Sequence, residues 1–76
     1  MIEIIEKCIK DMTGVEEKID QNINLSAYGL DSLRRVGLVI LLEEKFQLTF
    51  NDSDLTQKNF DTICSIDKLV RKYREE

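Results

Sequence analysis

The strongest constraint on the fold is the helical spacing of apolar residues in a chain that contains no proline. Near the amino terminus such residues recur every three or four positions, which predicts an amphipathic helix. They are Ile2, Ile5, Ile9 and Met12. Thr13-Gly14 ends this helix, because glycine readily takes the left-handed conformation that follows a helix. With 76 residues the chain can build one hydrophobic core, so we expect a single domain, residues 1–76.

Two further helices are predicted by the same pattern. One runs from Leu33 to Phe46 and can be capped by Asp31 or Ser32. Its apolar residues form two stripes, of which the first is expected in the core. The first stripe holds Leu38, Val39, Leu42 and Phe46, and the second holds Leu33, Val36 and Ile40. The other helix follows the capping residues Asp61 and Thr62. Its apolar positions are Ile63, Ile66, Leu69, Val70 and Tyr73.

The two segments between these helices differ in length and chemistry. Residues 15–31 form a long loop, in which Val15–Ile19 can form a helical turn. Apolar residues along the loop are spaced so that it can lie against the core, at Val15, Ile19, Ile23, Leu25, Tyr28 and Leu30. In the second segment, Asp52 or Ser53 can cap a short helix reaching about Lys58, with Phe50 and Phe60 at its ends. The sequence thus predicts an all-α bundle of three main helices plus a short third helix, with a long loop between the first two.

Charge and residue content exclude several classes of function. The net charge is −4 and the chain has no histidine, so we expect no nucleic-acid partner, no metal site and no Cys/His nucleophile. No export signal or membrane span is visible, since charges stand within the amino-terminal apolar run and no eighteen consecutive apolar residues occur. Cys8 and Cys64 are isolated, and we expect both to be small buried residues in a reducing cytoplasm. We also expect a monomer without catalytic residues.

One motif suggests a chemical role. Gly29-Leu30-Asp31-Ser32-Leu33 lies where the long loop meets the apolar second helix, and Asn59-Phe60-Asp61-Thr62-Ile63 leads into the last helix. These features resemble the acyl carrier and peptidyl carrier protein family, whose attachment serine stands in Asp-Ser-Leu at the start of the second of four helices. The resemblance covers nearly the whole chain. Taken alone, Asp-Ser-Leu is typical of an ordinary helix cap.

The resemblance implies that Ser32 receives 4′-phosphopantetheine from coenzyme A through a magnesium-dependent phosphopantetheinyl transferase. Asp31 would help that enzyme to position its metal, with Gly29 and Leu33 beside the attachment point. The arm would then carry acyl or aminoacyl groups as thioesters, loaded by an activating ligase and used by downstream enzymes. The start of a helix favours a phosphodiester, because its free N–H groups and dipole attract anions. Ser32 itself has no histidine to activate it as a nucleophile.

The second apolar stripe suggests where partner enzymes dock. Leu33, Val36 and Ile40 share one helical face with the start of the helix, although Val36 and Ile40 are equally well explained by packing against the short third helix. Arg34 and Arg35 stand where carriers of fatty acid synthesis usually have acidic residues. We therefore expect a discrete carrier of a specialised nonribosomal peptide, polyketide or aminoacyl pathway, and place these arginines on the docking surface.

Three alternatives remain. The chain can be an acyl carrier of fatty acid synthesis, in which case the arginines are only solvated charges. It can be an unmodified helical interaction module, with Ser32 serving as a cap. A helix-turn-helix DNA-binding protein is the third alternative, and the acidic charge balance argues against it.

Overall fold

Three α-helices and three short 3₁₀ turns make up the regular structure of residues 1–74, the part of the chain that this computed structural model describes. No strand occurs among these residues. In chain order the elements are α1 (Ile2–Thr13), η1 (Leu25–Tyr28), α2 (Ser32–Phe46), η2 (Asp52–Asp54), η3 (Lys58–Phe60) and α3 (Ile63–Arg74). The predicted all-α bundle is confirmed, as are the positions of its three main helices.

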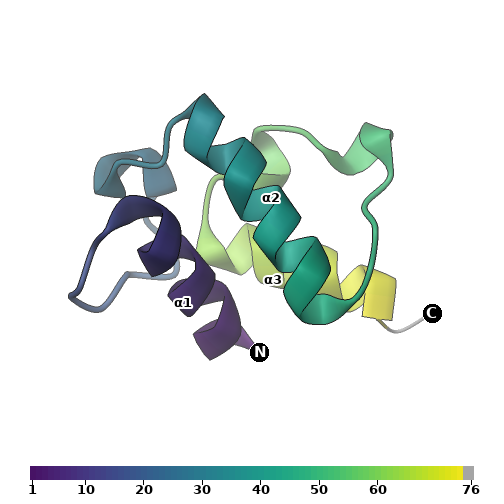
Figure 1. Ribbon diagram of the computed structural model, residues 1–76, viewed down its shortest axis with the longest axis horizontal. Coiled ribbons are helices and arrows are strands. Elements are labelled where there is room, and N and C mark those ends of the chain that lie inside the picture. Colours follow the sequence, from purple (N-terminus) through teal and green to yellow (C-terminus); the bar gives the residue numbers. More distant parts are fainter. Residues whose placement is uncertain (75–76) are drawn as a thin grey trace.

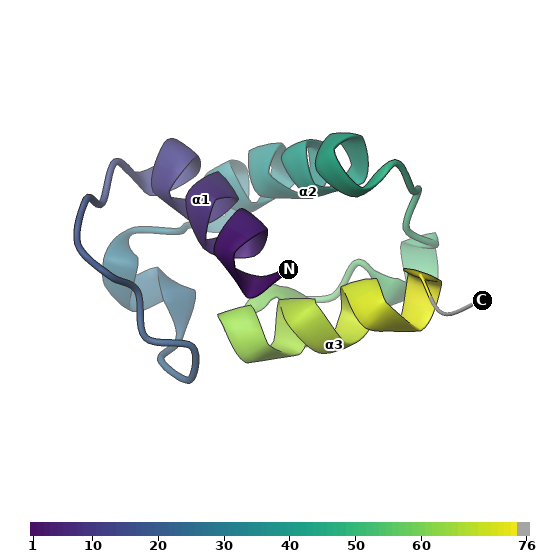
Figure 2. The same cartoon turned by 90° about the horizontal axis from the view of Figure 1, so that it is seen from below.

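The core lies where α1 packs against both α2 and α3 (Figure 1). Figure 2 shows that α2 and α3 run in the same direction, from the side of the long loop towards the carboxyl terminus. Each helix buries one apolar stripe in this core. The fully buried residues are Ile5, Cys8 and Ile9 of α1, Leu38 and Leu42 of α2, and Ile63, Ile66 and Val70 of α3. Gly14 ends α1 as predicted, with φ of 77° and its N–H donating to the Lys10 carbonyl at 2.8 Å.

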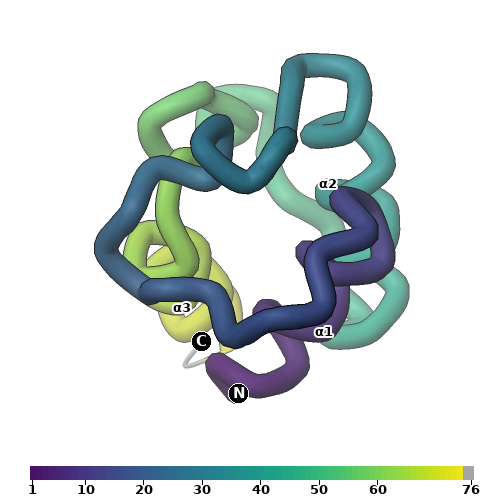
Figure 3. The backbone as a smooth tube through the Cα atoms, turned by 90° about the vertical axis from the view of Figure 1, so that its left-hand side faces the viewer, coloured from purple at the N-terminus to yellow at the C-terminus, as the bar shows by residue number. Residues whose placement is uncertain are grey.

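The long loop closes one end of the bundle, passing from α1 across to the start of α3 (Figure 3). Its backbone is bonded there: the Leu25 N–H donates to the Asp61 carbonyl at 2.7 Å, and the Cys64 N–H donates to the Gln21 carbonyl at 3.1 Å. The prediction that the loop lies against the core is confirmed for Ile19, Leu25 and Leu30, which are buried. These contacts set the path by which the chain reaches α2.

Two predictions within the loop are wrong. Ile23 is 44% exposed, so it does not join the core. Val15–Ile19 forms no helical turn, because the Ile19 N–H donates to Glu6 Oε2 of α1 at 2.9 Å. The helical turn of this loop is η1, where Asn24 Oδ1 accepts a hydrogen bond from the Ser26 N–H at 2.9 Å. Tertiary contacts therefore placed the turn nearer to α2 than the sequence pattern suggested.

The short third helix is also a wrong prediction, since two separate 3₁₀ turns, η2 and η3, take its place. A continuous helix would need the Asp54 carbonyl to accept from the Lys58 N–H. Instead the Asn59 side chain donates to that carbonyl at 2.8 Å. The Asp54 carboxylate is held against α3 by the Tyr73 hydroxyl, which donates to Oδ2 at 2.6 Å. Side-chain bonds to the backbone thus replace the helical bonds of this segment.

Phe50 and Phe60 hold the ends of this segment, as expected. Both rings are buried, and they meet edge to face with centroids 5.5 Å apart. The segment between them is therefore fixed against the core although it is not a regular helix.

The two cysteines differ in their surroundings. Cys8 is buried, as predicted, and burial raises the pKa of its thiol. Cys64 is only half-buried, so the expectation of full burial is wrong for this residue. Both thiols are free. None of the helices in residues 1–74 combines the length and the apolar character that crossing a membrane requires.

Candidate functional site

Ser32 is the first residue of α2, and Asp31 is its N-cap. Asp31 has an extended backbone, and its Oδ1 accepts a hydrogen bond from the Arg34 N–H at 2.8 Å. Gly29 ends η1 in the left-handed conformation, with φ of 96°, and this turn directs the chain towards Asp31. The Ser32 side chain is exposed. The hydroxyl is therefore presented at the positive end of a helix and is accessible to an enzyme.

Asp31 and Arg34 form an ion pair beside Ser32. Arg34 Nη1 lies 3.0 Å from Asp31 Oδ2, and both side chains are more than half exposed. The hydrogen bond from the Arg34 N–H lowers the pKa of Asp31 below its ordinary value, and the Arg34 guanidinium lowers it further. Asp31 is thus ionised at neutral pH, and the charge of Arg34 is largely offset by it.

The second apolar stripe of α2 is exposed. Leu33 is 80% exposed, and Val36 and Ile40 are each 59% exposed. Leu55, from the segment between η2 and η3, is 43% exposed. We call Leu33, Val36, Ile40 and Leu55 the α2 apolar surface. Packing against a third helix does not explain Val36 and Ile40, since most of each side chain faces solvent.

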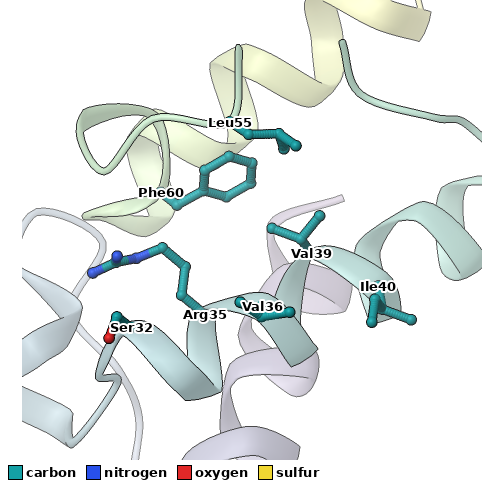
Figure 4. A pocket seen from close by; sticks show the side chains of 7 residues that line it. All are labelled: Ser32, Arg35, Val36, Val39, Ile40, Leu55 and Phe60. Atoms are coloured by element: carbon teal, nitrogen blue, oxygen red, sulfur yellow. The ribbon is translucent and has the colours of Figure 1, made fainter. Parts of the chain in front are cut away.

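A pocket of about 280 Å³ begins at Ser32 and follows α2 (Figure 4). It separates α2 from the segment that carries Leu55 and Phe60. Its lining residues are Ser32, Arg35, Val36, Val39, Ile40, Leu55 and Phe60. A single face of α2 supplies one wall, because Arg35, Val36, Val39 and Ile40 stand three, four, seven and eight positions after Ser32. The pocket thus brings the candidate attachment serine together with an apolar cleft and one cation.

Sequence reasoning missed part of this pocket. Val39 packs against the core as predicted, but it is only half-buried and also lines the pocket. Phe60 was expected only to hold a chain segment, and Leu55 was not identified. The spacing of Val39 from Ser32 could have indicated that both face the pocket, because seven residues make about two helical turns. Leu55 gives no such signal, since it is an isolated apolar residue in a polar segment.

Comparison with known proteins identifies the family. A profile of the phosphopantetheine attachment site (PP-binding) family matches residues 3–66. The chain belongs to this family. It is therefore a carrier domain: such domains hold a covalently attached 4′-phosphopantetheine and act as non-catalytic tethers. No match to the carrier domain was found among curated proteins.

Two crystal structures from Bradyrhizobium japonicum contain chains with the fold of this carrier domain. In one, glycine:[carrier protein] ligase is complexed with its cognate carrier protein and an analogue of glycyl adenylate. There the identity is 21%, the TM-score is 0.75, and the match covers 93% of this chain and 91% of that chain. In the other, the ligase is complexed with glycylated carrier protein. The values are 20% identity, a TM-score of 0.72, and 90% of each chain.

The residues around Ser32 fit a phosphopantetheine arm. The exposed hydroxyl can be esterified, the pocket beside it is apolar, and Arg35 lines that pocket. The Nε atom of Arg35 is buried and has no hydrogen-bond partner among residues 1–74. A buried guanidinium N–H calls for an acceptor. An arm attached at Ser32 would supply such an acceptor, the phosphodiester oxygens.

Proposed function

We propose that this carrier domain bears 4′-phosphopantetheine on Ser32 and holds acyl or aminoacyl groups for partner enzymes. The observation that carries the proposal is the exposed Ser32 hydroxyl at the start of α2, within a chain of the phosphopantetheine attachment family. In the modification, the Ser32 oxygen forms a bond to the phosphorus next to pantetheine in coenzyme A. The pyrophosphate bond breaks, adenosine 3′,5′-bisphosphate leaves, and the Ser32 proton passes to a base of the transferase. When bound, the arm supplies a terminal thiol that forms thioesters.

Asp31, Gly29 and Leu33 assist this modification in different ways. The Asp31 carboxylate is exposed and ionised, which suits a contribution to the magnesium ion of the transferase. Gly29 leaves open space, since apart from its two chain neighbours no residue has an atom within 4 Å of where its side chain would begin. Leu33 follows Ser32 and is the most exposed large apolar residue recorded in the chain, so it is suited to contact an incoming enzyme.

The α2 apolar surface is the docking site in this proposal. Its occupants are the phosphopantetheinyl transferase and, after modification, the activating ligase and later enzymes. The surface is continuous with the pocket that begins at Ser32, because Val36, Ile40 and Leu55 belong to both. Arg34 and Arg35 flank it, but Arg34 is already paired with Asp31. A partner therefore meets an apolar face with little net charge at its Ser32 end.

We further propose an aminoacyl group as the cargo, in a specialised pathway. The likeness of the fold to carriers bound by a glycine ligase supports this choice. Arg35 supports it too, because it has no carboxylate partner among residues 1–74 and leaves positive charge where a basic partner surface would be repelled. The same charge of Arg35 counts against the acyl carrier of fatty acid synthesis. In this proposal residues 1–76 form one carrier domain that acts as a monomer in the reducing cytoplasm, where its two thiols stay free.

Intact mass spectrometry tests the attachment. The apo protein is incubated with coenzyme A and a broad-specificity transferase, and its mass should rise by one phosphopantetheine. Ser32→Ala should show no rise. Ser26→Ala is the matched control, because Ser26 is also exposed and also lies at the start of a helical turn, η1, whose N-cap is Asn24. Ser26→Ala should gain mass as the wild type does.

An unmodified wild type would favour the interaction module, in which Ser32 only begins a helix. The cargo needs a separate experiment, in which holo protein is offered amino acids and fatty acids with candidate ligases. Aminoacyl thioesters should accumulate, and selective loading of fatty acids would instead indicate the lipid pathway.

A further inference from the structure

Arg35 differs from its neighbour Arg34 although both stand in the first turns of α2. Arg34 is paired with Asp31 at 3.0 Å, and its side chain is 51% exposed. Arg35 is half-buried, and its Nε has no hydrogen-bond partner among residues 1–74. Desolvating a guanidinium N–H without an acceptor is unfavourable, so such groups usually mark a missing partner.

The position of Arg35 indicates where that partner would lie. Ser32 and Arg35 are three residues apart on α2, which places their Cβ atoms about 5–6 Å from each other on one face. Figure 4 shows the Arg35 side chain extending towards the Ser32 end of the pocket, away from Ile40. An anion attached to the Ser32 oxygen therefore falls within reach of the guanidinium.

The carboxylate of Asp31, the acidic residue next to Ser32, is bonded to Arg34 and not to the Arg35 side chain. Asp31 Oδ1 accepts from the Arg34 N–H, and Oδ2 faces the Arg34 guanidinium. No ion pair of Arg35 is recorded within residues 1–74. Residues 1–74 therefore supply no acceptor for Arg35 Nε, and a group attached at Ser32 can supply one.

We propose that Arg35 donates its Nε–H to the phosphodiester of the arm on Ser32, and that this bond directs the arm into the pocket. The inference rests on the proposed function, which supplies the phosphodiester. Arginine suits this role because its guanidinium remains charged and matches phosphate geometry, while lysine lacks the planar fork. Beyond Arg35 the wall of the pocket is apolar, with Val39, Leu55 and Phe60 available to contact the two methyl groups of pantetheine.

Nuclear magnetic resonance of apo and holo protein tests the inference directly. The mass of each sample is measured first, so that modification is established independently. In the holo protein the Arg35 Nε–H resonance should shift, and its exchange with water should slow by about tenfold or more, as a charge-assisted hydrogen bond predicts. The Arg34 Nε–H should change little, because its partner Asp31 is present in both states. The pantetheine methyl protons should show nuclear Overhauser contacts to the Phe60 ring.

Two holo variants separate Arg35 from a general charge effect. Arg35→Gln should lose the contacts to Phe60, whereas Arg34→Gln removes the same charge and should keep them. Arg35→Lys should restore them only in part, since it keeps the charge without Nε. The wild-type comparison needs neither variant and stands if one fails to be modified.

The outcomes distinguish the two proposals. Absence of a mass gain overturns the proposed function and this inference with it. A mass gain with an unchanged Arg35 Nε–H overturns the inference alone. An Arg35 resonance that shifts only when a partner enzyme is added also overturns it, because the acceptor would then be a group of that enzyme.

Discussion

α2 and α3 lie on either side of α1, yet they use their apolar residues differently. In α3 the apolar residues Ile63, Ile66, Leu69 and Val70 are all buried. In α2 only Leu38, Leu42 and Phe46 are buried, while Leu33, Val36 and Ile40 remain exposed. Exposed apolar side chains contribute little to folding stability, and a group of them beside Ser32 is typical of a binding surface.

The two helices therefore have different roles in the bundle. α3 contributes a single apolar stripe to the core. α2 contributes a stripe to the core and presents a second one beside Ser32, where a partner enzyme has to approach. A helix with one stripe stabilises the fold, and a helix with two also offers a binding surface.

The largest expected effect comes from shortening one isoleucine in each helix. Ile66→Ala in α3 should lower the free energy of unfolding by about 2–5 kcal/mol, because it removes a fully buried side chain. Ile40→Ala in α2 should change it by less than about 0.5 kcal/mol, since that side chain is 59% exposed. Urea unfolding measures both. Equal losses would mean that the two helices do not differ as described.

The next effect concerns partner binding and uses the same α2 variant. Ile40→Ala should lower kcat/KM for modification by the transferase about five- to tenfold, as expected for an interface residue. Ile4→Ala is the matched control, because Ile4 lies on α1 and is 44% exposed. It should stay within about twofold of wild type. If both variants are modified at the wild-type rate, the α2 apolar surface is not where the transferase docks.

A smaller loss is expected at the cap of α3. Thr62 Oγ1 accepts a hydrogen bond from the Ser65 N–H at 3.0 Å, which is the bond of an N-cap. Thr62→Ala should lower the free energy of unfolding by about 1 kcal/mol, and Thr62→Ser should restore most of it. Thermal and urea unfolding provide the measurement. A neutral Thr62→Ala would show that the start of α3 is held by the loop alone.

The smallest expected effect is a difference in pH dependence between the Asp31 cap of α2 and the Thr62 cap of α3. The pKa of Asp31 is lowered in the folded state, mainly by the Arg34 N–H. The contribution of Asp31 to the first turn of α2 is therefore complete above the ordinary pKa of aspartate and is lost as the pH falls through the lowered value. The Arg34 amide resonance should follow this titration, while the Ser65 amide, capped by a neutral threonine, should not. In Asp31→Asn the titration of Arg34 should disappear.

Features decided by neighbouring residues could be predicted from the sequence. The end of α1 at Gly14 and the start of α2 beside Asp31 depend on local backbone chemistry, and both were found as expected. The segment after α2 could not be predicted in this way. Its helix is interrupted by Asn59 and by the contact of Asp54 with Tyr73, which is 19 residues further along the chain. No local pattern indicates a hydrogen bond over that separation.

In the candidate site, too, local features could be predicted from the sequence and tertiary contacts could not. The sequence alone determined that Ser32 would stand at the start of an apolar helix, because caps and helical spacing act over a few residues. Only the tertiary structure decided that the second stripe of α2 stays exposed, that Leu55 and Phe60 complete a pocket beside Ser32, and that Arg35 rather than Arg34 lines it. The reason is physical: burial and pairing depend on which distant segments pack against a helix, and its own sequence does not contain that information.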